Sequence, residues 1–348
     1  MGALPRIPDP GEVPTEAVEA LRAIPGSETL VFTASASAGP DGIGSPFAQA
    51  LLAAWGPERA ALAELLLFGL AVDGADLPAA EALEACGLAH AVGGGRLASA
   101  FRAIPLLDTV FVADAPAGAP DACLPPSPTT LELATVAPPT AGRLLDVGCG
   151  AGALSVAAAL GGAGTVVAVD RSPRACALTR LNASIAGVEI DVREGDLLAP
   201  VAGERFDVVV SQPPYLPLPP SLTAIGHLHG GPVGDEIARA LLGGLASALA
   251  ADGVATVRAD RSVSTHPYPG TEVSWPGPAS EDLATVYAAV HVALDGPERE
   301  QVEAAYRAYL PRLRSCFVVV TADASPRAVE VDEPPRSWPA LFDLALFG

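Results

Sequence analysis

The stretch from Arg143 to Leu160, RLLDVGCGAGALSVAAAL, constrains the fold more than any other part of the chain. A short apolar run leads into Asp146 and Val147, three glycines follow at alternate positions, and a run of Ala, Leu and Val comes after them. This order predicts a buried strand, a tight glycine turn and a helix. Glycine lets the backbone turn sharply and approach a ligand closely, and the helix start offers unpaired N–H groups.

A second strand is predicted from Thr165 to Val169, and Asp170 follows it directly. An acid at the end of the second strand of a βαβ unit typically accepts hydrogen bonds from ribose hydroxyls. The glycines are spaced G-C-G-A-G, which does not match the dinucleotide pattern G-x-G-x-x-G. No G-K-[ST] motif is present, and the chain contains no lysine. NAD and ATP are therefore disfavoured as ligands.

A third apolar strand of the parallel-sheet type, Phe206 to Ser211, runs directly into Gln212-Pro213-Pro214-Tyr215. Taken together, DVGCGAG, VAVD, EGDLL and VVVSQPPY resemble the class I S-adenosylmethionine (SAM) dependent methyltransferases. The closest resemblance is to the branch with an Asn-Pro-Pro-Tyr motif, which methylates release-factor glutamine, ribosomal RNA guanine N2 or DNA adenine N6. It covers roughly residues 124–260 and departs from the branch at Gln212, where the family has Asn or Asp.

The resemblance implies an α/β, Rossmann-like class I methyltransferase fold with a mostly parallel seven-stranded sheet, and SAM as the cofactor. It implies that catalysis depends on Gln212, Pro213 and Tyr215. The Gln212 amide oxygen and a proline carbonyl would accept hydrogen bonds from the N–H groups of the nitrogen to be methylated. The Tyr215 ring would stack on a planar substrate group near the sulfonium cation. The residues expected to hold SAM are Thr129, Asp146, Gly148, Cys149, Gly150, Gly152, Asp170, Arg171, Asp196, Leu197 and Gln212.

Several of these assignments have alternatives. Asp146 either contacts the ligand or only braces the glycine turn. Thr129 either contacts the methionine carboxylate of SAM or only caps a helix predicted from Pro128 through Val136. Asp196 either accepts from the adenine amine, as the resemblance implies, or is a surface acid in a turn. A nucleophilic role for Cys149 is disfavoured, because no base lies nearby in the sequence.

The chain of 348 residues is long enough for about two domains. Helical segments and a hairpin signal around Gly93-Gly94-Gly95 make residues 1–120 resemble a winged-helix module, mainly helical, while residues 121–348 are expected to form the catalytic domain. The first part carries 14 acidic residues against 5 arginines. A lid, substrate-binding or dimerisation module is therefore favoured over a reader of nucleic acid.

The formal net charge of −20 also disfavours a nucleic-acid substrate, because phosphate affinity depends on cations. The five cysteines show no metal-site spacing, and the first residues lack an apolar signal core. The uncharged run from Cys149 to Val169 is divided by glycines, so it is not read as a membrane span. We expect a soluble cytoplasmic protein, with no membrane contact and with a homodimer left open.

The proline- and glycine-rich loop after the motif, residues 217–234, contains His227 and His229. No third ligand lies nearby, so no metal is expected, and contact with a substrate is the alternative. Three functions remain open: N-methylation of a small molecule or peptide, methylation of ribosomal RNA or a release factor, and cyclisation of SAM itself with release of methylthioadenosine. The acidic chain and the altered motif favour the first.

Overall fold

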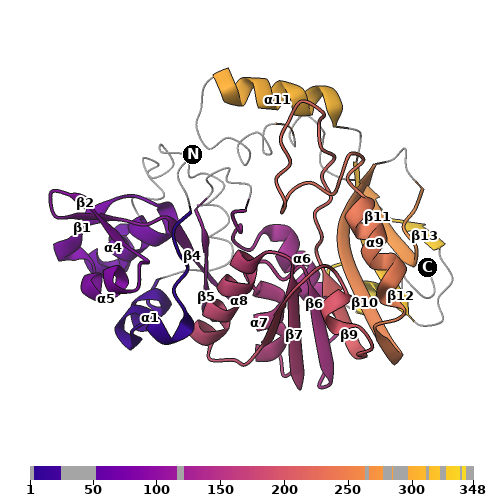
Figure 1. Ribbon diagram of the computed structural model, residues 1–348, viewed down its shortest axis with the longest axis horizontal. Coiled ribbons are helices and arrows are strands. Elements are labelled where there is room, and N and C mark those ends of the chain that lie inside the picture. The colour runs from indigo at the N-terminus through magenta and orange to yellow at the C-terminus, as the bar shows by residue number, and fades with distance from the viewer. Residues whose placement is uncertain are drawn as a thin grey trace.

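The computed structural model describes residues 4–24, 52–115, 121–262, 266–276, 284, 297–310, 313–321, 327–337 and 339–341. Its centre is an eight-stranded sheet with the order β13-β11-β12-β10-β9-β6-β7-β8 (Figure 1). The strands are β6 Arg143–Val147, β7 Thr165–Asp170, β8 Asp191–Glu194, β9 Phe206–Ser211, β10 Leu249–Ser262, β11 Thr271–Pro276, β12 Leu313–Thr321 and β13 Arg327–Glu330. Only β12 is antiparallel to its neighbours in this sheet, so the expected mostly parallel α/β architecture is confirmed.

The expected number of seven strands is wrong by one within the described residues. The additional strand is β11, which pairs antiparallel with β12 on one side and parallel with β13 on the other. Val273 and Trp275 on this strand are both buried, because their side chains enter the core beside Phe317. Glu272 and Ser274, on the opposite face of the strand, are buried as well, so both faces of β11 are covered.

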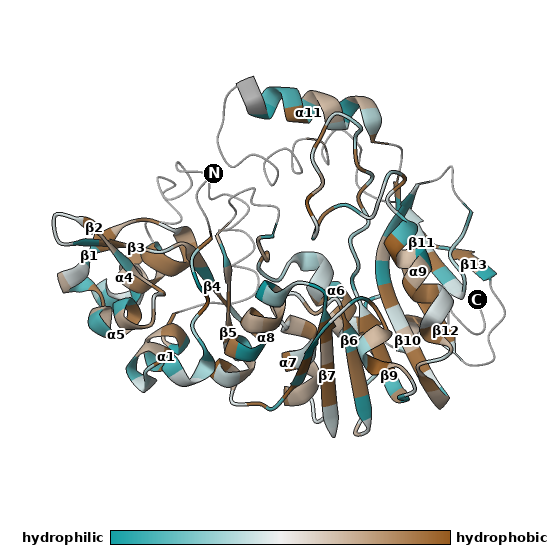
Figure 2. Ribbon diagram, viewed as in Figure 1, coloured by the Kyte–Doolittle hydropathy of each residue, from teal (hydrophilic) through white to brown (hydrophobic). Residues whose placement is uncertain are grey.

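Helices cover both faces of the sheet. The bounds are α6 Pro128–Val136, α7 Ala153–Leu160, α8 Pro173–Ala186, α9 Glu236–Leu245 and α11 Pro297–Tyr309. On one face α6 and α7 pack through Leu133, Val136 and Leu154, and on the other face α9 packs through Leu241 and Leu245. The central strands are mainly apolar along their length (Figure 2), as expected for parallel strands buried on both faces.

The N-terminal part contains short helices and a small sheet. Its elements are η1 Pro10–Glu12, α1 Thr15–Arg22, α4 Pro57–Leu62, a π-helical turn at Ala63–Phe68, β1 Val72–Asp73, η4 Gly74–Asp76, α5 Ala80–Ala85, β2 His90–Gly93, β3 Arg96–Ala98, β4 Phe101–Leu106 and β5 Thr109–Asp114. The predicted turn at Gly93-Gly94-Gly95 joins β2 to β3, and all three glycines have positive φ. β4 instead pairs with β5 as a separate hairpin.

The N-terminal part shares a hydrophobic core with helix α8. Leu21, Leu62 and Leu83 belong to the same cluster as Leu178 and Leu181 of α8. The described contacts thus extend across the expected division of the chain at residue 120. That division and the role of residues 1–120 stay predictions. None of the helices described here is long and apolar enough to cross a membrane.

Candidate active site

The glycine turn after β6 adopts backbone conformations that only glycine takes readily. The φ values of Gly148, Gly150 and Gly152 are 76°, 56° and 83°. The amides of Gly148 and Cys149 donate to the carbonyl of Val169 at 2.7 and 3.1 Å, so the turn is attached to the end of β7. A Cβ on Gly148 would meet nothing within 4 Å, which leaves this side of the turn open to a ligand.

Asp170 at the end of β7 holds the same turn from the other side. Its Oδ2 accepts from the Gly150 amide at 3.0 Å, and its Oδ1 accepts from the Ser172 amide at 2.9 Å. Burial raises the pKa of this carboxyl group, which the two amide hydrogen bonds partly offset. Arg171 beside it is exposed. Each carboxylate oxygen retains a further acceptor position, as contact with a ribose would require.

Asp146 on β6 is a buried acid with one unused oxygen. The residue is 1% exposed, and its Oδ2 accepts from the Ser155 hydroxyl at 2.6 Å. Among the residues the structure describes, nothing donates to Oδ1. Burial raises the pKa of Asp146 to about 7. An orphaned carboxylate oxygen beside the glycine turn suits a cationic group, such as the ammonium of an amino acid.

Gln212, at the end of β9, is held by the first turn of α6. Its Nε2 donates to Thr129 Oγ1 at 2.6 Å. Thr129 is in turn within 2.8 Å of the Ser127 hydroxyl, and Ser127 caps α6 by accepting from the Thr130 amide. The cap of α6 is therefore Ser127 and not Thr129, so the alternative that Thr129 only caps the helix is wrong. Thr129 instead contacts the motif, and its contact with SAM stays a prediction.

The motif continues along the edge of the core. Pro213 is buried, and Tyr215 is partly buried against the cluster that contains α9. β9 and β10 are paired in register up to Ser211 and Val257, so Arg258 is the next residue of β10 beside the start of the motif. The motif thus lies between α6, the core under α9 and the carboxyl end of β10.

Arg258 is a buried cation that sequence reasoning did not single out. It is 3% exposed, and it pairs with Glu132 of α6 at 3.1 Å and with Asp260 at 2.7 Å. Its guanidinium also lies 5.2 Å from the ring centre of Trp275. Burial acts to lower the pKa of Arg258, but Asp260 and the other neighbouring groups raise it above its usual value. The residue links α6 to β10, and its partner Glu132 is 126 residues away, so the sequence gives no signal for such a role.

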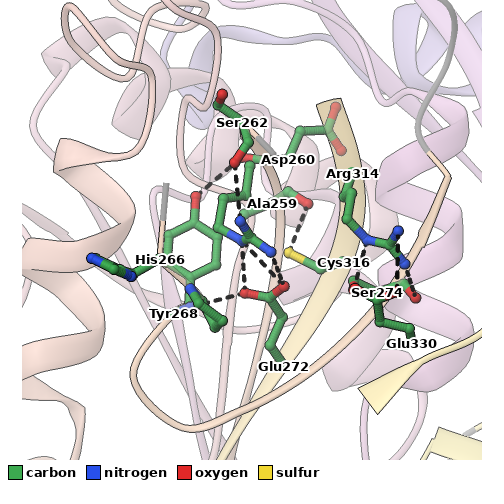
Figure 3. Close-up of polar contacts among 12 residues, drawn as sticks. Ala259, Asp260, Ser262, His266, Tyr268, Glu272, Ser274, Arg314, Cys316 and Glu330 are labelled. Carbon is green, nitrogen blue, oxygen red and sulfur yellow. Dashed lines mark hydrogen bonds and ion pairs between the residues drawn. The ribbon is translucent and has the colours of Figure 1, made fainter. Parts of the chain in front are cut away.

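The carboxyl end of β10 is fixed by a second buried polar network (Figure 3). Arg261 pairs with Glu272 at 2.9 Å, and the same carboxylate accepts from the Tyr268 amide at 2.8 Å. The Tyr268 hydroxyl donates to the Asp260 carbonyl at 3.0 Å. These contacts join the carboxyl end of β10 to β11 and to the segment between them.

The remaining predicted residues lie in the turn after β8 and in the glycine turn. Asp196 is exposed in the turn after β8, and Leu197 has a φ of 48° and packs against the core under α9. Cys149 is buried, and its sulfur accepts from Thr179 Oγ1 at 3.3 Å. Burial raises the pKa of this thiol well above its usual value, which does not suit a nucleophile.

Asn182 is a buried brace that sequence reasoning missed. It exchanges hydrogen bonds of 2.8 Å with both backbone groups of Val112 on β5 and donates to the carbonyl of Ala151 in the glycine turn. In the part of the chain that is described, no group of His, Cys, Asp and Glu could hold a metal ion.

Comparison with known proteins places this site in a family. Residues 127–219 match the model of the methyltransferase small domain family. The release factor glutamine methyltransferase of Deinococcus radiodurans is 40% identical over 34% of this chain and 45% of its own length. The ribosomal RNA small subunit methyltransferase C of Sodalis glossinidius is 36% identical over 24% of each chain, and the ribosomal protein L11 methyltransferase of Pelotomaculum thermopropionicum is 50% identical over 20% of this chain and 23% of its own.

This chain thus spans less than half the length of each of these relatives, and their names give three different acceptors. The matched segment contains the glycine turn, Asp170 and the QPPY motif. The sheet order around it is that of an α/β fold with helices on both faces. Residues 127–219 are therefore identified as part of a class I, SAM-dependent methyltransferase domain.

Proposed function

We propose that the protein is a SAM-dependent enzyme that methylates a nitrogen atom on a small molecule or a peptide. The observation that carries this proposal is the hydrogen bond from Gln212 to Thr129 at the end of β9. It sets an amide in a fixed orientation immediately before Pro213-Pro214-Tyr215, next to the glycine turn expected to hold the cofactor.

The proposed cofactor site extends along the carboxyl ends of β8, β7, β6 and β9. Asp196 and Leu197 would lie at the adenine, Asp170 at the ribose, the glycine turn with Cys149 along the centre, and Asp146 Oδ1 toward the ammonium. Arg171 would contribute only from the surface. The open side of Gly148 and the orphaned oxygen of Asp146 fit such a ligand. When bound, SAM supplies an electrophilic methyl group on a sulfonium.

Gln212 is proposed to accept a hydrogen bond from the acceptor nitrogen. Because Thr129 occupies its Nε2, the carbonyl oxygen Oε1 faces away from this contact, and none of the described residues donates to it. An acceptor N–H placed on Oε1 would have its nitrogen lone pair directed at the methyl group. Alignment of this kind can lower a barrier by about 7–11 kcal/mol at its upper limit. The tether to Thr129 also gives the longer Gln side chain a fixed position.

Tyr215 is proposed as the platform on which a planar acceptor group stacks, with Pro213 fixing the backbone between them. The acceptor is proposed to be small or flexible rather than folded RNA, since the net charge of −20 opposes binding to phosphates. A release-factor-like peptide is the second candidate, because the Deinococcus radiodurans relative bears that name.

The acceptor can be identified with SAM that carries a deuterated methyl group. The protein is incubated with this SAM and separate small-molecule, peptide and RNA fractions of a cell extract, and mass spectrometry locates the labelled product. Label that appears with the wild-type protein but not with Gln212→Ala supports the proposal. Label in RNA alone, or equal labelling by the two proteins, would contradict it.

A further inference from the structure

Helix α6 contacts two neighbouring strands through two polar side chains. Thr129 accepts a hydrogen bond from Gln212 Nε2 at 2.6 Å, and Glu132 accepts one from Arg258 Nε at 3.1 Å. Residues three apart in a helix lie on the same face, so both contacts belong to one face of α6. Gln212 and Arg258 directly follow the last paired residues of β9 and β10, which are adjacent in the sheet. The two contacts therefore lie side by side.

Arg258 is held in place by groups other than Glu132. Its Nη1 donates to the carbonyl of Ala259 and to Asp260 Oδ1, each at 2.7 Å. Its guanidinium also lies 5.2 Å from the ring centre of Trp275, which favours a cation. The buried carboxylate of Asp260 already balances the positive charge. The second carboxylate, from Glu132, thus brings the helix to a cation that is fixed on the sheet.

The apolar contacts of α6 do not by themselves define its orientation. Leu133 and Val136 are fully buried in the cluster beneath the helix. Apolar packing is non-directional, so it fixes the distance of the helix from the sheet better than its rotation. Hydrogen bonds between charged groups are directional and strong. Glu132 supplies such a contact from the edge of the helix, where its side chain is 38% exposed.

Arg258 also lies near the last residue of the motif. Burial acts to lower the pKa of Arg258, and Asp260, Tyr215 and Glu132 raise it above its usual value. The effect of Tyr215 places its hydroxyl within electrostatic range of the guanidinium. The arginine that holds α6 is therefore close to both ends of the motif, to Gln212 through the neighbouring strands and to Tyr215 through this interaction.

We infer that Glu132 is a positioning residue for the reaction, whose ion pair with Arg258 sets the rotation of α6 and so presents Thr129 to Gln212. The inference rests on the proposed function, in which Gln212 orients the acceptor nitrogen. Glu132 acts on the reaction through Thr129. The two contacts of α6 are consequently coupled, and loss of the ion pair weakens the hydrogen bond from Gln212.

The side-chain amide of Gln212 reports this coupling without cofactor or acceptor. The glutamines of the chain are Gln49, Gln212 and Gln301, so ¹⁵N labelling of glutamine side chains gives few NMR signals, and Gln212→Ala assigns the one needed. Thr129→Val should shift this signal, because the amide loses its hydrogen bond. We expect Glu132→Leu to shift it to the same position, and the double variant to shift it no further. Glu132→Gln should give an intermediate shift, since an uncharged oxygen still accepts from the arginine.

Glu204→Leu is the matched control. Glu204 is 31% exposed at its side chain and pairs at 2.5 Å with Arg143, the first residue of β6. Its replacement should leave the Gln212 signal at the wild-type position. Because exposed ion pairs contribute little to stability, both leucine variants should fold. A wild-type signal in Glu132→Leu, or an equal shift in Glu132→Leu and Glu204→Leu, would overturn the inference.

The rate of methyl transfer separates this inference from the proposed function. With deuterated SAM and the small-molecule or peptide fraction, Glu132→Leu should form labelled product about fivefold to tenfold more slowly than the wild type, as Thr129→Val should. Slower labelling by the double variant than by either single variant would mean that Glu132 does not act through Thr129. A wild-type protein that labels no fraction would instead refute the proposed function, and the role of Glu132 in catalysis with it.

Discussion

Gln212 and Thr129 are separated by 83 residues in the sequence and are joined by a hydrogen bond of 2.6 Å from Nε2 to Oγ1. This contact joins the end of β9 to the first turn of α6. It uses the donor of the glutamine amide and leaves the carbonyl oxygen for an acceptor. The contact therefore gives the Gln212 side chain a partner on α6.

Replacing Thr129 by valine should loosen the Gln212 amide and slow methyl transfer. The loss of one hydrogen bond, worth about 1 kcal/mol, corresponds to a rate lower by roughly fivefold to tenfold. Thr135→Val is the matched control, because Thr135 is exposed on the same helix and only donates to the Leu131 carbonyl. The measurement is initial-rate kinetics with the identified acceptor. Equal rates for the two variants would exclude the proposed role of Thr129.

Gly148→Ala should weaken cofactor binding more than it weakens the fold. Gly148 has a φ of 76°, and an added Cβ meets no protein atom within 4 Å, so only a bound ligand would be obstructed. Gly162→Ala is the control, since its φ is 94° and its Cβ would also meet nothing within 4 Å. Both variants should lose a similar amount of stability, about 1 kcal/mol. Calorimetry with adenosylhomocysteine should show weaker binding only for Gly148→Ala.

Asp146→Asn should change how stability depends on pH. The folded-state pKa is about 7, and the unfolded value is about 3.9. Between these values the native state binds more protons, so the stability contributed by Asp146 is greatest at low pH and falls as pH rises toward 7. Asparagine removes this dependence, and the variant should gain stability relative to the wild type by at most about 4 kcal/mol above pH 7.

The free energy of unfolding of both proteins is measured by urea titration between pH 4.5 and 8, at pH intervals of roughly half a unit. A stability difference between them that stays constant with pH would contradict the buried, weakly acidic state of Asp146. A difference that grows with pH would support it.

Arg258→Met should destabilise the fold strongly, whereas Glu132→Gln should not. Removal of Arg258 leaves Asp260, which is 4% exposed, as a buried charge without this partner, at a cost of about 3–5 kcal/mol. Glu132 is 38% exposed at its side chain, so the loss of its charge should cost about 1 kcal/mol or less. Denaturant titration compares them, and similar losses for both variants would contradict the assigned burial.

The central fold was predictable because its signals are local. The run Phe206–Ser211 and the helix Pro128–Val136 have the predicted bounds, since apolar composition, proline and capping residues act within a few positions. β11 was not predicted, because a strand of six residues with mixed polarity depends on both of its neighbours for pairing. Propensity alone does not encode such long-range pairing.

The candidate site was predictable only where its residues belong to the motifs. Asn182 lies near the end of α8, yet its partner Val112 is 70 residues away. Arg258 is part of the site because it is buried and paired with Glu132 and Asp260, and Asp146 because its Oδ1 is buried without a donor. Burial and pairing depend on the folded structure, so the sequence pattern alone does not predict them. The roles of Asp196, Leu197 and Arg171 remain predictions.

The most direct measurement is incubation of the purified protein with SAM, first alone and then with the identified acceptor, with the products read by mass spectrometry. The account predicts that adenosylhomocysteine forms only when the acceptor is present, and that Gln212→Ala and Tyr215→Ala reduce its formation. Methylthioadenosine formed from SAM alone, faster than in those two variants, would contradict methyl transfer and establish cyclisation of SAM instead.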